Sequence, residues 1–555
     1  MKASYFSVLP LTPHSFLYSP LRAPSVLKEA PRIAAMPLQI KVKEKQRDTM
    51  TINFIPNDPL AGASMPTRQI TPRPDRPSNR AGFRFFDSVP EGLFDPGTPE
   101  FLFWQCREAA LLSVEVWESL NGNLTRWARN RKRLDLQQDA GDNLNAFYTT
   151  QSLLFYHHST GNKTTFSGIS TDVVAHEAGH AFLDSIRPDI WLSSFTEVAA
   201  FHEAFGDCLA ILVALFDKPT RKALLEVAPD LRRGNFTEAT AEDLSDGVRR
   251  AAGSSHPASA PRHALNNFRF QLPTTLPPTG GPNALTSEIH SFGRIFSGCF
   301  YDLISNLFAA SPQRNEASLL AAAKTAGKLL IAGAKKAPET QRFFQAVGRA
   351  MVLEDQAVNG GANRQQIIDA FARHDIALGS AAMVAPRASL EGKAPKLGAK
   401  AKRPTLSAAT TKDLRKRIGA APGTKLAVSG VEIGEERVAQ VVHYREVPLG
   451  SLSKQLKGVV AVAAEPVLVG AAGGRAALVS ALPEPNTTTD EVHTFVETLL
   501  KNDQIAFDGR ARAAKARRVG AVNDRQPHGL PTHKVVTRDG KKVLTRIRFA
   551  CAHCD

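Results

Sequence analysis

The residues best able to do chemistry form a His-Glu-Ala-Gly-His run at positions 176–180. In a helix, residues four apart project from one face, so the imidazoles of His176 and His180 can bind the same metal ion. Glu177 lies between them, where it can take a proton from water bound to that metal and return it to the leaving amine of a peptide. This spacing is typical of zinc hydrolases, although five-residue matches also arise by chance in ordinary amphipathic helices.

A catalytic zinc ion needs a third protein ligand and one open position. Two carboxylates of the next helical segment, Glu197 and Glu203, compete for this role. Asp207 follows Glu203 by four residues, so it lies on the same helix face and can accept the other ring N–H of a ligating histidine. Glu197 has a phenylalanine at that position. We therefore predict Glu203 as the third ligand, and Asp207 as the residue that holds one of the ligating histidines in place.

Helices must position these groups, and apolar residues recur at helical spacing through most of the chain. This periodicity predicts helices over 98–121, 171–186, 195–216, 290–309, 315–334, 338–353 and 361–376. Aromatic and β-favouring residues over 144–158 predict two short strands. The chain therefore mixes helices and strands.

DVVAHEAGHAF, followed by HEAFGD, resembles the thermolysin-like branch of the gluzincin zinc metallopeptidases, and the likeness extends over roughly residues 83–380. In that family the glutamate of an E-x-x-x-D motif on the next helix is the third zinc ligand, and it falls here on Glu203. The resemblance implies an α+β fold. We expect a two-lobed zincin-type peptidase domain, with a small α/β lobe, a mostly helical lobe and the zinc helix at the floor of the cleft between them.

Asn145-Ala146-Phe147-Tyr148 resembles the N-A-F-W edge strand of that family. By this likeness, the side chain of Asn145 and the carbonyl of Ala146 hold a peptide substrate by strand addition. Without the zinc site, an ordinary edge strand explains the run equally well.

IHSFGRIFSGCFYDLI, at 289–304, resembles the family segment whose histidine donates a hydrogen bond to the transition-state oxyanion. That role falls on His290, although a lone histidine at a helix start is more often structural. APRHALNN lies at the family's separation before it, and the resemblance makes Arg262 the substrate-clamping arginine.

Some positions depart from the family pattern. Trp191 stands where the family usually has a tyrosine that helps to bind the oxyanion, and Leu285 replaces the aspartate expected beside the catalytic histidine. Glu288 is available as a substitute for that aspartate. Asp172 matches one calcium ligand of the family, but the acidic cluster that completes the site is missing after Phe216, so we predict no double calcium site.

The composition divides the chain into four predicted regions. Residues 1–82 are Pro-rich and aperiodic and predict a largely disordered extension. The peptidase domain covers 83–380, a basic low-complexity linker covers 381–410, and a separate small α+β C-terminal domain of unassigned role covers 411–555. Within the last region, Asp539-Gly540 predicts a hairpin turn.

The formal net charge of +16 lies mostly in the last third of the chain. A solvated basic surface explains it, and without a reader of interleaved aromatic residues we expect no nucleic-acid partner. The five cysteines are too few and scattered for a disulfide framework. Cys551, His553 and Cys554 end the chain, and we interpret them as a frayed tail with reactive thiols rather than a metal site.

The sequence contains no run of about 18 apolar residues, so it predicts no membrane span. The N-terminus lacks the unbroken apolar stretch of a secretory signal, so we expect a cytoplasmic protein, with secretion by another route as the alternative. We predict a monomeric zinc-dependent metalloendopeptidase that hydrolyses internal bonds of a peptide or protein substrate. The alternative is a catalytically silent binding protein with the peptidase fold, which acts through its basic C-terminal region.

Overall fold

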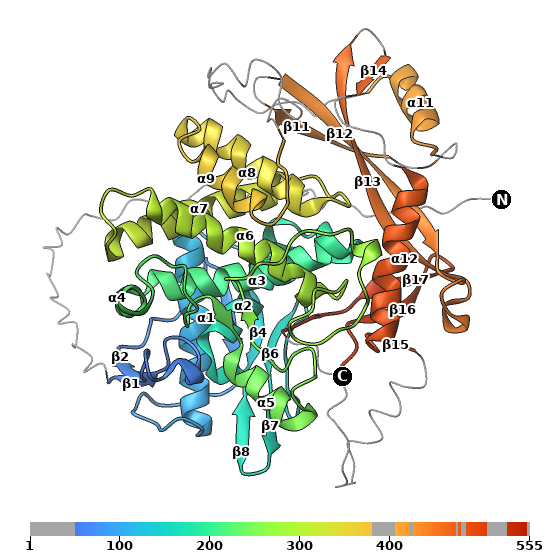
Figure 1. Cartoon of the computed structure of the whole chain (residues 1–555). Coiled ribbons are helices and arrows are strands. Elements are labelled where there is room, and N and C mark those ends of the chain that lie inside the picture. Colours follow the sequence, from blue (N-terminus) through green and yellow to red (C-terminus); the bar gives the residue numbers. More distant parts are fainter. Residues whose placement is uncertain are drawn as a thin grey trace, which may run out of the picture.

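Figure 1 shows the computed structural model of the chain, in which helices and strands are mixed throughout. The structure describes residues 50–379, 406–420, 424, 426–433, 436–472, 475–478, 484–507 and 530–551. Residues 1–49 and most of the predicted linker lie outside this described part.

A five-stranded sheet has the strand order β18-β5-β6-β4-β3. Its strands are β3 (Gly82–Phe85), β4 (Arg133–Gln137), β5 (Ala146–Tyr148), β6 (Ser152–Phe155) and β18 (Phe549–Ala550). β3, β4 and β6 run parallel, whereas β5 is antiparallel to both β6 and β18. The outer neighbour of β5 therefore comes from the far end of the sequence.

A series of α-helices lies between residues 99 and 372. They are α1 (Pro99–Asn121), α2 (Thr171–Ile186), α3 (Thr196–Phe216), α4 (Lys218–Val227), α5 (Glu242–Ala252), α6 (Ile289–Ala309), α7 (Glu316–Lys336), α8 (Phe343–Asn359) and α9 (Arg364–Ala372). The helices predicted from periodicity are confirmed, with shifted ends. Helix α9 begins later than predicted because Gly360 and Gly361 take positive φ angles of 64° and 82°, which interrupt the helical backbone.

Residues beyond 406 build a second, seven-stranded sheet of order β11-β12-β13-β17-β16-β15, with β14 paired to β13. Its strands are β11 (Ala427–Ile433), β12 (Glu436–Pro448), β13 (Val459–Ala472), β14 (Arg475–Leu478), β15 (Ile505–Ala506), β16 (His533–Arg538) and β17 (Lys541–Arg546). Two helices accompany it, α11 (Ala408–Arg417) and α12 (Pro485–Lys501). The hairpin predicted at Asp539-Gly540 is confirmed, since both residues have positive φ between β16 and β17.

Three two-stranded antiparallel sheets complete the strands of the described residues. They pair β1 (Ile52–Phe54) with β2 (Arg68–Ile70), β7 (His157–Thr160) with β8 (Lys163–Phe166), and β9 (Ala239–Thr240) with β10 (Arg262–His263). The segment 144–158 therefore contributes to three strands, β5, β6 and β7, where the sequence predicted two.

Residues 50–82 contain strands and buried side chains, so the prediction of a largely disordered extension is wrong for these residues. Contacts with distant parts of the chain hold this segment in place, and such contacts leave no periodic pattern in the local sequence. Phe54 and Met65 are buried in the main core, and Arg68 forms an ion pair of 2.5 Å with Asp217. Further along, Arg76 pairs with Glu118 of α1 at 2.6 Å.

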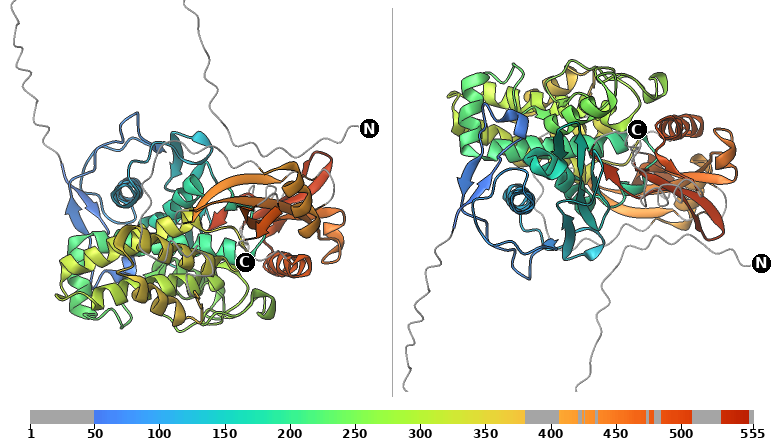
Figure 2. Two further views of the ribbon diagram at one scale, coloured as in Figure 1. Left: turned by 90° about the horizontal axis from the view of Figure 1, so that it is seen from above. Right: turned by 90° about the horizontal axis from the view of Figure 1, so that it is seen from below.

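The main hydrophobic core continues from the helices into the C-terminal sheet, and it includes Val459 and Phe495 of that part. Figure 2 shows the C-terminal strands beside the helical part, with α12 alongside them. Ser287 and Thr498 share a hydrogen bond of 2.7 Å across this junction. The division into a peptidase domain and a separate C-terminal domain stays a prediction.

Two helices among the described residues, α3 and α7, are long and apolar enough to pass a test for membrane spans. The most apolar window of α3 is completely buried in the protein, and 56% of the window of α7 is buried. Core helices of this kind pass the same test, so they are weak evidence for a membrane span.

Candidate metal centre

Helices α2 and α3 cross at two glycines, which lets their backbones come unusually close. A Cβ added at Gly179 would lie 2.8 Å from the Cα of Gly206. Real Cβ atoms do not approach so closely, so neither position tolerates a side chain without a shift of the helices. The crossing turns the two histidines of α2 toward the glutamate of α3.

His176, His180 and Glu203 meet at this crossing, and all three are buried. Oε2 of Glu203 lies 3.3 Å from Nε2 of His176 and 3.6 Å from Nε2 of His180. These nitrogens and both Glu203 oxygens have no hydrogen-bond partner among the described residues. Buried polar atoms without partners are costly, and two imidazoles with one carboxylate form a donor set that suits zinc. The residues therefore fit a divalent metal ion.

Asp207 contacts the first histidine from its position one turn after Glu203. Oδ1 of Asp207 lies 2.9 Å from Nδ1 of His176 and 2.8 Å from the guanidinium of Arg262. Burial alone would raise the pKa of Asp207, but Arg262 and His176 lower it to about 2. A carboxylate that accepts the Nδ1 proton leaves Nε2 of His176 as the free ligand atom.

His202 orients the second histidine, and the sequence analysis did not single it out. Nδ1 of His202 lies 2.9 Å from Nδ1 of His180. Burial, followed by the nearby imidazole of His180, holds the pKa of His202 well below its usual value, so its ring is neutral. A neutral His202 can accept the Nδ1 proton of His180, which leaves the Nε2 atom of His180 free. The sequence feature that could have indicated His202 is its position directly before Glu203.

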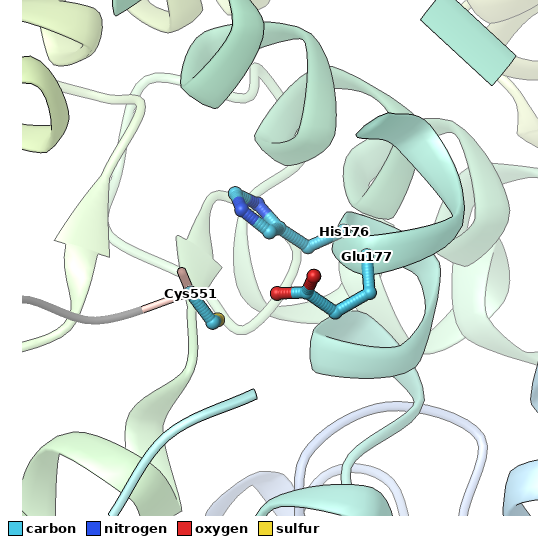
Figure 3. Close-up of side chains that lie close together, drawn as sticks. All are labelled: His176, Glu177 and Cys551. Atoms are coloured by element: carbon cyan, nitrogen blue, oxygen red, sulfur yellow. The ribbon is translucent and has the colours of Figure 1, made fainter. Parts of the chain in front are cut away.

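Glu177 is completely buried, and neither of its oxygens has a hydrogen-bond partner among the described residues. Burial raises the pKa of Glu177 to about 8, against the opposing charge of His176. A carboxyl group that titrates close to neutral pH suits the exchange of protons with a reacting group. Figure 3 shows its carboxylate near both the ring of His176 and the side chain of Cys551.

His290 approaches the centre from the first turn of α6. Its Nε2 lies 3.2 Å from Oε2 of Glu203, and its Nδ1 lies 2.7 Å from Oε1 of Glu288. Burial opposes protonation, but the charges of Glu203 and Glu288 raise the pKa of His290 well above its usual value. Glu288 is thus the acidic partner that the sequence offered in place of the family aspartate.

The predicted peptide-holding groups also lie at this centre. Oδ1 of Asn145 accepts a hydrogen bond from the amide of Ala146 at 2.9 Å. The carbonyl of Ala146 accepts one from the amide of Cys551 at 2.9 Å, and Arg262 donates to the carbonyl of Cys551 at 2.6 Å. A pocket lined in part by Arg262 and His290 opens beside them.

The competing candidate, Glu197, lies elsewhere. Its Oε1 is 2.6 Å from the guanidinium of Arg342, and its Oε2 accepts a hydrogen bond of 3.1 Å from the amide of Phe344. Trp191 stacks edge-on against Tyr148 and Phe549, with ring centroids 5.6 and 5.3 Å away.

Asp172 lies in an acidic cluster with Asp58 and Glu242, and one carboxylate oxygen of each residue lies within 4.8 Å of those of the other two. The carboxylates of Asp172 and Asp58 already accept hydrogen bonds from backbone amides, including those of Ala241 and Asp243. Asp58 lies in the stretch that was predicted to be disordered, so it was not among the residues expected at a site. The absence of a double calcium site stays a prediction.

The interpretation of the last residues as a frayed tail is wrong for Cys551, which is completely buried. The pairing of β18 with β5 carries it into the site, a contact between residues about 400 positions apart. His553 and Cys554 lie outside the described residues.

Residues 134–382 match the family model of the fungalysin metallopeptidases, M36. The match is consistent with the thermolysin-like zinc metallopeptidases. The family implies a zinc-dependent metalloendopeptidase, a hydrolase that acts on peptides or proteins. No curated protein matches the chain.

Proposed function

On the premise that residues 134–382 are a fungalysin-type metallopeptidase domain, we propose that the centre at His176, His180 and Glu203 hydrolyses internal peptide bonds. The observation that carries this proposal is the set of buried, unpartnered donor atoms of these three residues beside the equally unpartnered carboxylate of Glu177. Such atoms are unfavourable unless a cation and a reactant complete their interactions.

His176, His180 and Glu203 would hold the zinc ion, while Asp207 and His202 keep the two imidazoles in the tautomers that expose Nε2. When bound, zinc supplies Lewis-acid chemistry, since it lowers the pKa of water and polarises a carbonyl oxygen. With three protein ligands, the ion would keep room for the reactants.

Glu177 acts as the general base and then as the general acid. It takes a proton from the attacking water and delivers it to the nitrogen of the scissile bond, so that a carboxylate and an amine leave the site. Its buried carboxylate has no hydrogen-bond partner among the described residues, so it is free to hold the proton between the two steps. Nε2 of protonated His290 donates a hydrogen bond to the oxyanion of the former carbonyl.

The peptide adds as a strand along β5. The carbonyl of Ala146 accepts a substrate amide, the side chain of Asn145 holds the substrate backbone, and Arg262 donates to a substrate carbonyl. Arg262 is itself held in place by Asp207 at 2.8 Å, so the metal ligands and the substrate clamp share one carboxylate.

The other candidate is a binding protein that keeps the fold without catalysis. The complete donor set and the intact Glu177 argue against it, because a site freed from selection for catalysis has no reason to keep a buried, unpartnered carboxylate.

The replacement Glu177→Gln separates the two candidates. Glu177 is not one of the three ligands, so the variant should keep zinc and lose nearly all hydrolysis of an internally quenched peptide, by a factor of about 10² or more. Metal analysis and peptide hydrolysis measure the two effects, and Glu226→Gln on the exposed face of α4 is the matched control. Unchanged hydrolysis in Glu177→Gln would refute the mechanism.

A further inference from the structure

We infer that the segment Phe549–Cys551 is an internal inhibitor, which occupies the peptide-binding strand of the centre in the orientation of a substrate. The inference rests on the proposed function for the identity of the centre as a peptidase site. It assigns to the end of the described chain a role in the regulation of that site.

Strand addition is the first observation. β18 pairs antiparallel with β5, with Phe549 opposite Tyr148 and Ala550 opposite Phe147. The amide of Cys551 continues this ladder with a hydrogen bond of 2.9 Å to the carbonyl of Ala146. This is the acceptor that we assign to a substrate amide, so a substrate and the segment compete for the same edge.

Two consecutive backbone carbonyls of the segment accept hydrogen bonds from His290 and Arg262, the side chains that we assign to the carbonyl groups of a substrate. The oxygen of Ala550 lies 2.6 Å from Nε2 of His290, and the oxygen of Cys551 lies 2.6 Å from the guanidinium of Arg262. Because Nε2 of His290 is also 3.2 Å from Glu203, the carbonyl of Ala550 is held beside the metal ligands. The Ala550–Cys551 peptide bond therefore takes the place of the bond to be cut.

The side chains of Phe549 and Cys551 also contact residues of the centre. The ring of Phe549 stacks on His202 and His180, with ring centroids 4.0 and 4.7 Å apart. The guanidinium carbon of Arg546 lies 4.1 Å from the centroid of the same Phe549 ring. Sγ of Cys551 lies within 4.8 Å of a ring nitrogen of His176 and a carboxylate oxygen of Glu177 (Figure 3). The segment thus covers both the metal ligands and the base.

A substrate cannot reach Ala146, His290 and Arg262 while the segment holds them. The segment must first be displaced, or its Ala550–Cys551 bond must be hydrolysed, which adds one water and gives a carboxylate on Ala550 and an amine on Cys551. In both cases the full chain is latent until the segment leaves.

Two substitutions in the full, zinc-loaded chain test this inference. Phe549→Ser removes the ring that stacks on the histidines, and Cys551→Pro removes the amide that donates to Ala146. Lys534→Ser, on an exposed position of β16, is the matched control. The probe is a fluorescent peptide with the sequence Arg-Phe-Ala-Cys-Ala, which copies residues 548–552.

Both variants should bind the probe at least about tenfold more tightly than the original chain and the control, because the internal competitor is weakened. Hydrogen exchange should show residues 146–148 protected in the original chain and less protected in the variants. Hydrolysis of the quenched peptide should rise by a similar factor at equal zinc content. The intact mass of the protein distinguishes the two routes, because displacement of the segment leaves the mass unchanged and hydrolysis after Ala550 lowers it.

Equal probe affinity and equal exchange at residues 146–148 in the original chain and both variants would overturn the inference. Variants that bind the probe more tightly, retain zinc and hydrolyse nothing would uphold the internal competitor and refute the peptidase. If Phe549→Ser lowers the melting temperature too far, Cys551→Pro, which leaves the ring in place, decides the matter.

Discussion

Gly206 lies against the imidazole of His176: a Cβ at position 206 would stand 2.6 Å from Nδ1 of the ring. The same ring nitrogen donates a hydrogen bond of 2.9 Å to the carboxylate of Asp207. The place of the first metal ligand is therefore defined by a glycine as much as by the charged groups around it, because only a residue without a side chain leaves room for the ring.

The change Gly206→Ala should force His176 and helix α2 away from α3. Overpacking of this kind costs about 1–3 kcal/mol of the free energy of unfolding, and the shifted imidazole should weaken zinc binding at least tenfold. Thermal unfolding and competition with a zinc chelator measure the two effects. Gly281→Ala is the control, since a Cβ there meets nothing within 4 Å. Equal zinc affinity in both variants would contradict this account of the crossing.

The two glutamates of α3 should differ in their effect on metal content. Glu203→Gln removes the carboxylate that faces both imidazoles, so the purified variant should contain little zinc. Glu197→Gln should keep zinc and lose stability instead, because its partner is Arg342 at 2.6 Å. Metal analysis of the two proteins checks this, and the reverse result would reassign the third ligand.

Arg342 joins α3 to the C-terminal helix α12, since its guanidinium contacts both Glu197 and Glu491. Arg342→Ala should leave two buried carboxylates without their cation and lower the free energy of unfolding by on the order of 3 kcal/mol. Urea unfolding measures the loss, and Lys222→Ala at an exposed position of α4 should change little. A loss no larger than that of the control would show that this ion pair does not stabilise the junction.

Glu465 of β13 should make the protein sensitive to acid. Burial raises its pKa, but hydrogen bonds from His443, Arg445 and Thr488 outweigh this and lower the pKa of Glu465 to about 2. A depressed carboxyl pKa stabilises the fold fully above the ordinary value of 4.5, and this stabilisation is lost as the pH falls from 4.5 to about 2.

Stability curves of the original chain and of Glu465→Gln should therefore differ by on the order of 2 kcal/mol near pH 7 and converge toward pH 2. Thermal unfolding across this pH range tests the expectation. Parallel curves would show that Glu465 keeps an ordinary pKa in the folded protein.

Helical periodicity made much of the centre predictable. The four-residue spacings of His176 to His180 and Glu203 to Asp207 are local properties of a helix, and both helices form where the apolar pattern indicates. The pairing of His290 with Glu288 is equally local, because the two lie two residues apart at the start of α6.

Other groups at the centre could not be predicted from the sequence. His202 contacts His180 only because α2 and α3 cross at two glycines. The periodicity of one helix does not predict where it crosses another. The order of the extension after residue 50 depends on ion pairs with α1 and α3–α4 residues, so its Pro-rich sequence resembles a disordered arm.

By itself, then, the sequence determined which side chains face one way along each helix, since a fixed rise and rotation per residue convert spacing into direction. The tertiary structure alone decided that Cys551 lies against Ala146 and Arg262, the latter 289 residues away in the chain. Strand addition uses backbone amides and carbonyls, which nearly every residue carries, so the residue types of the segment do not reveal its partner.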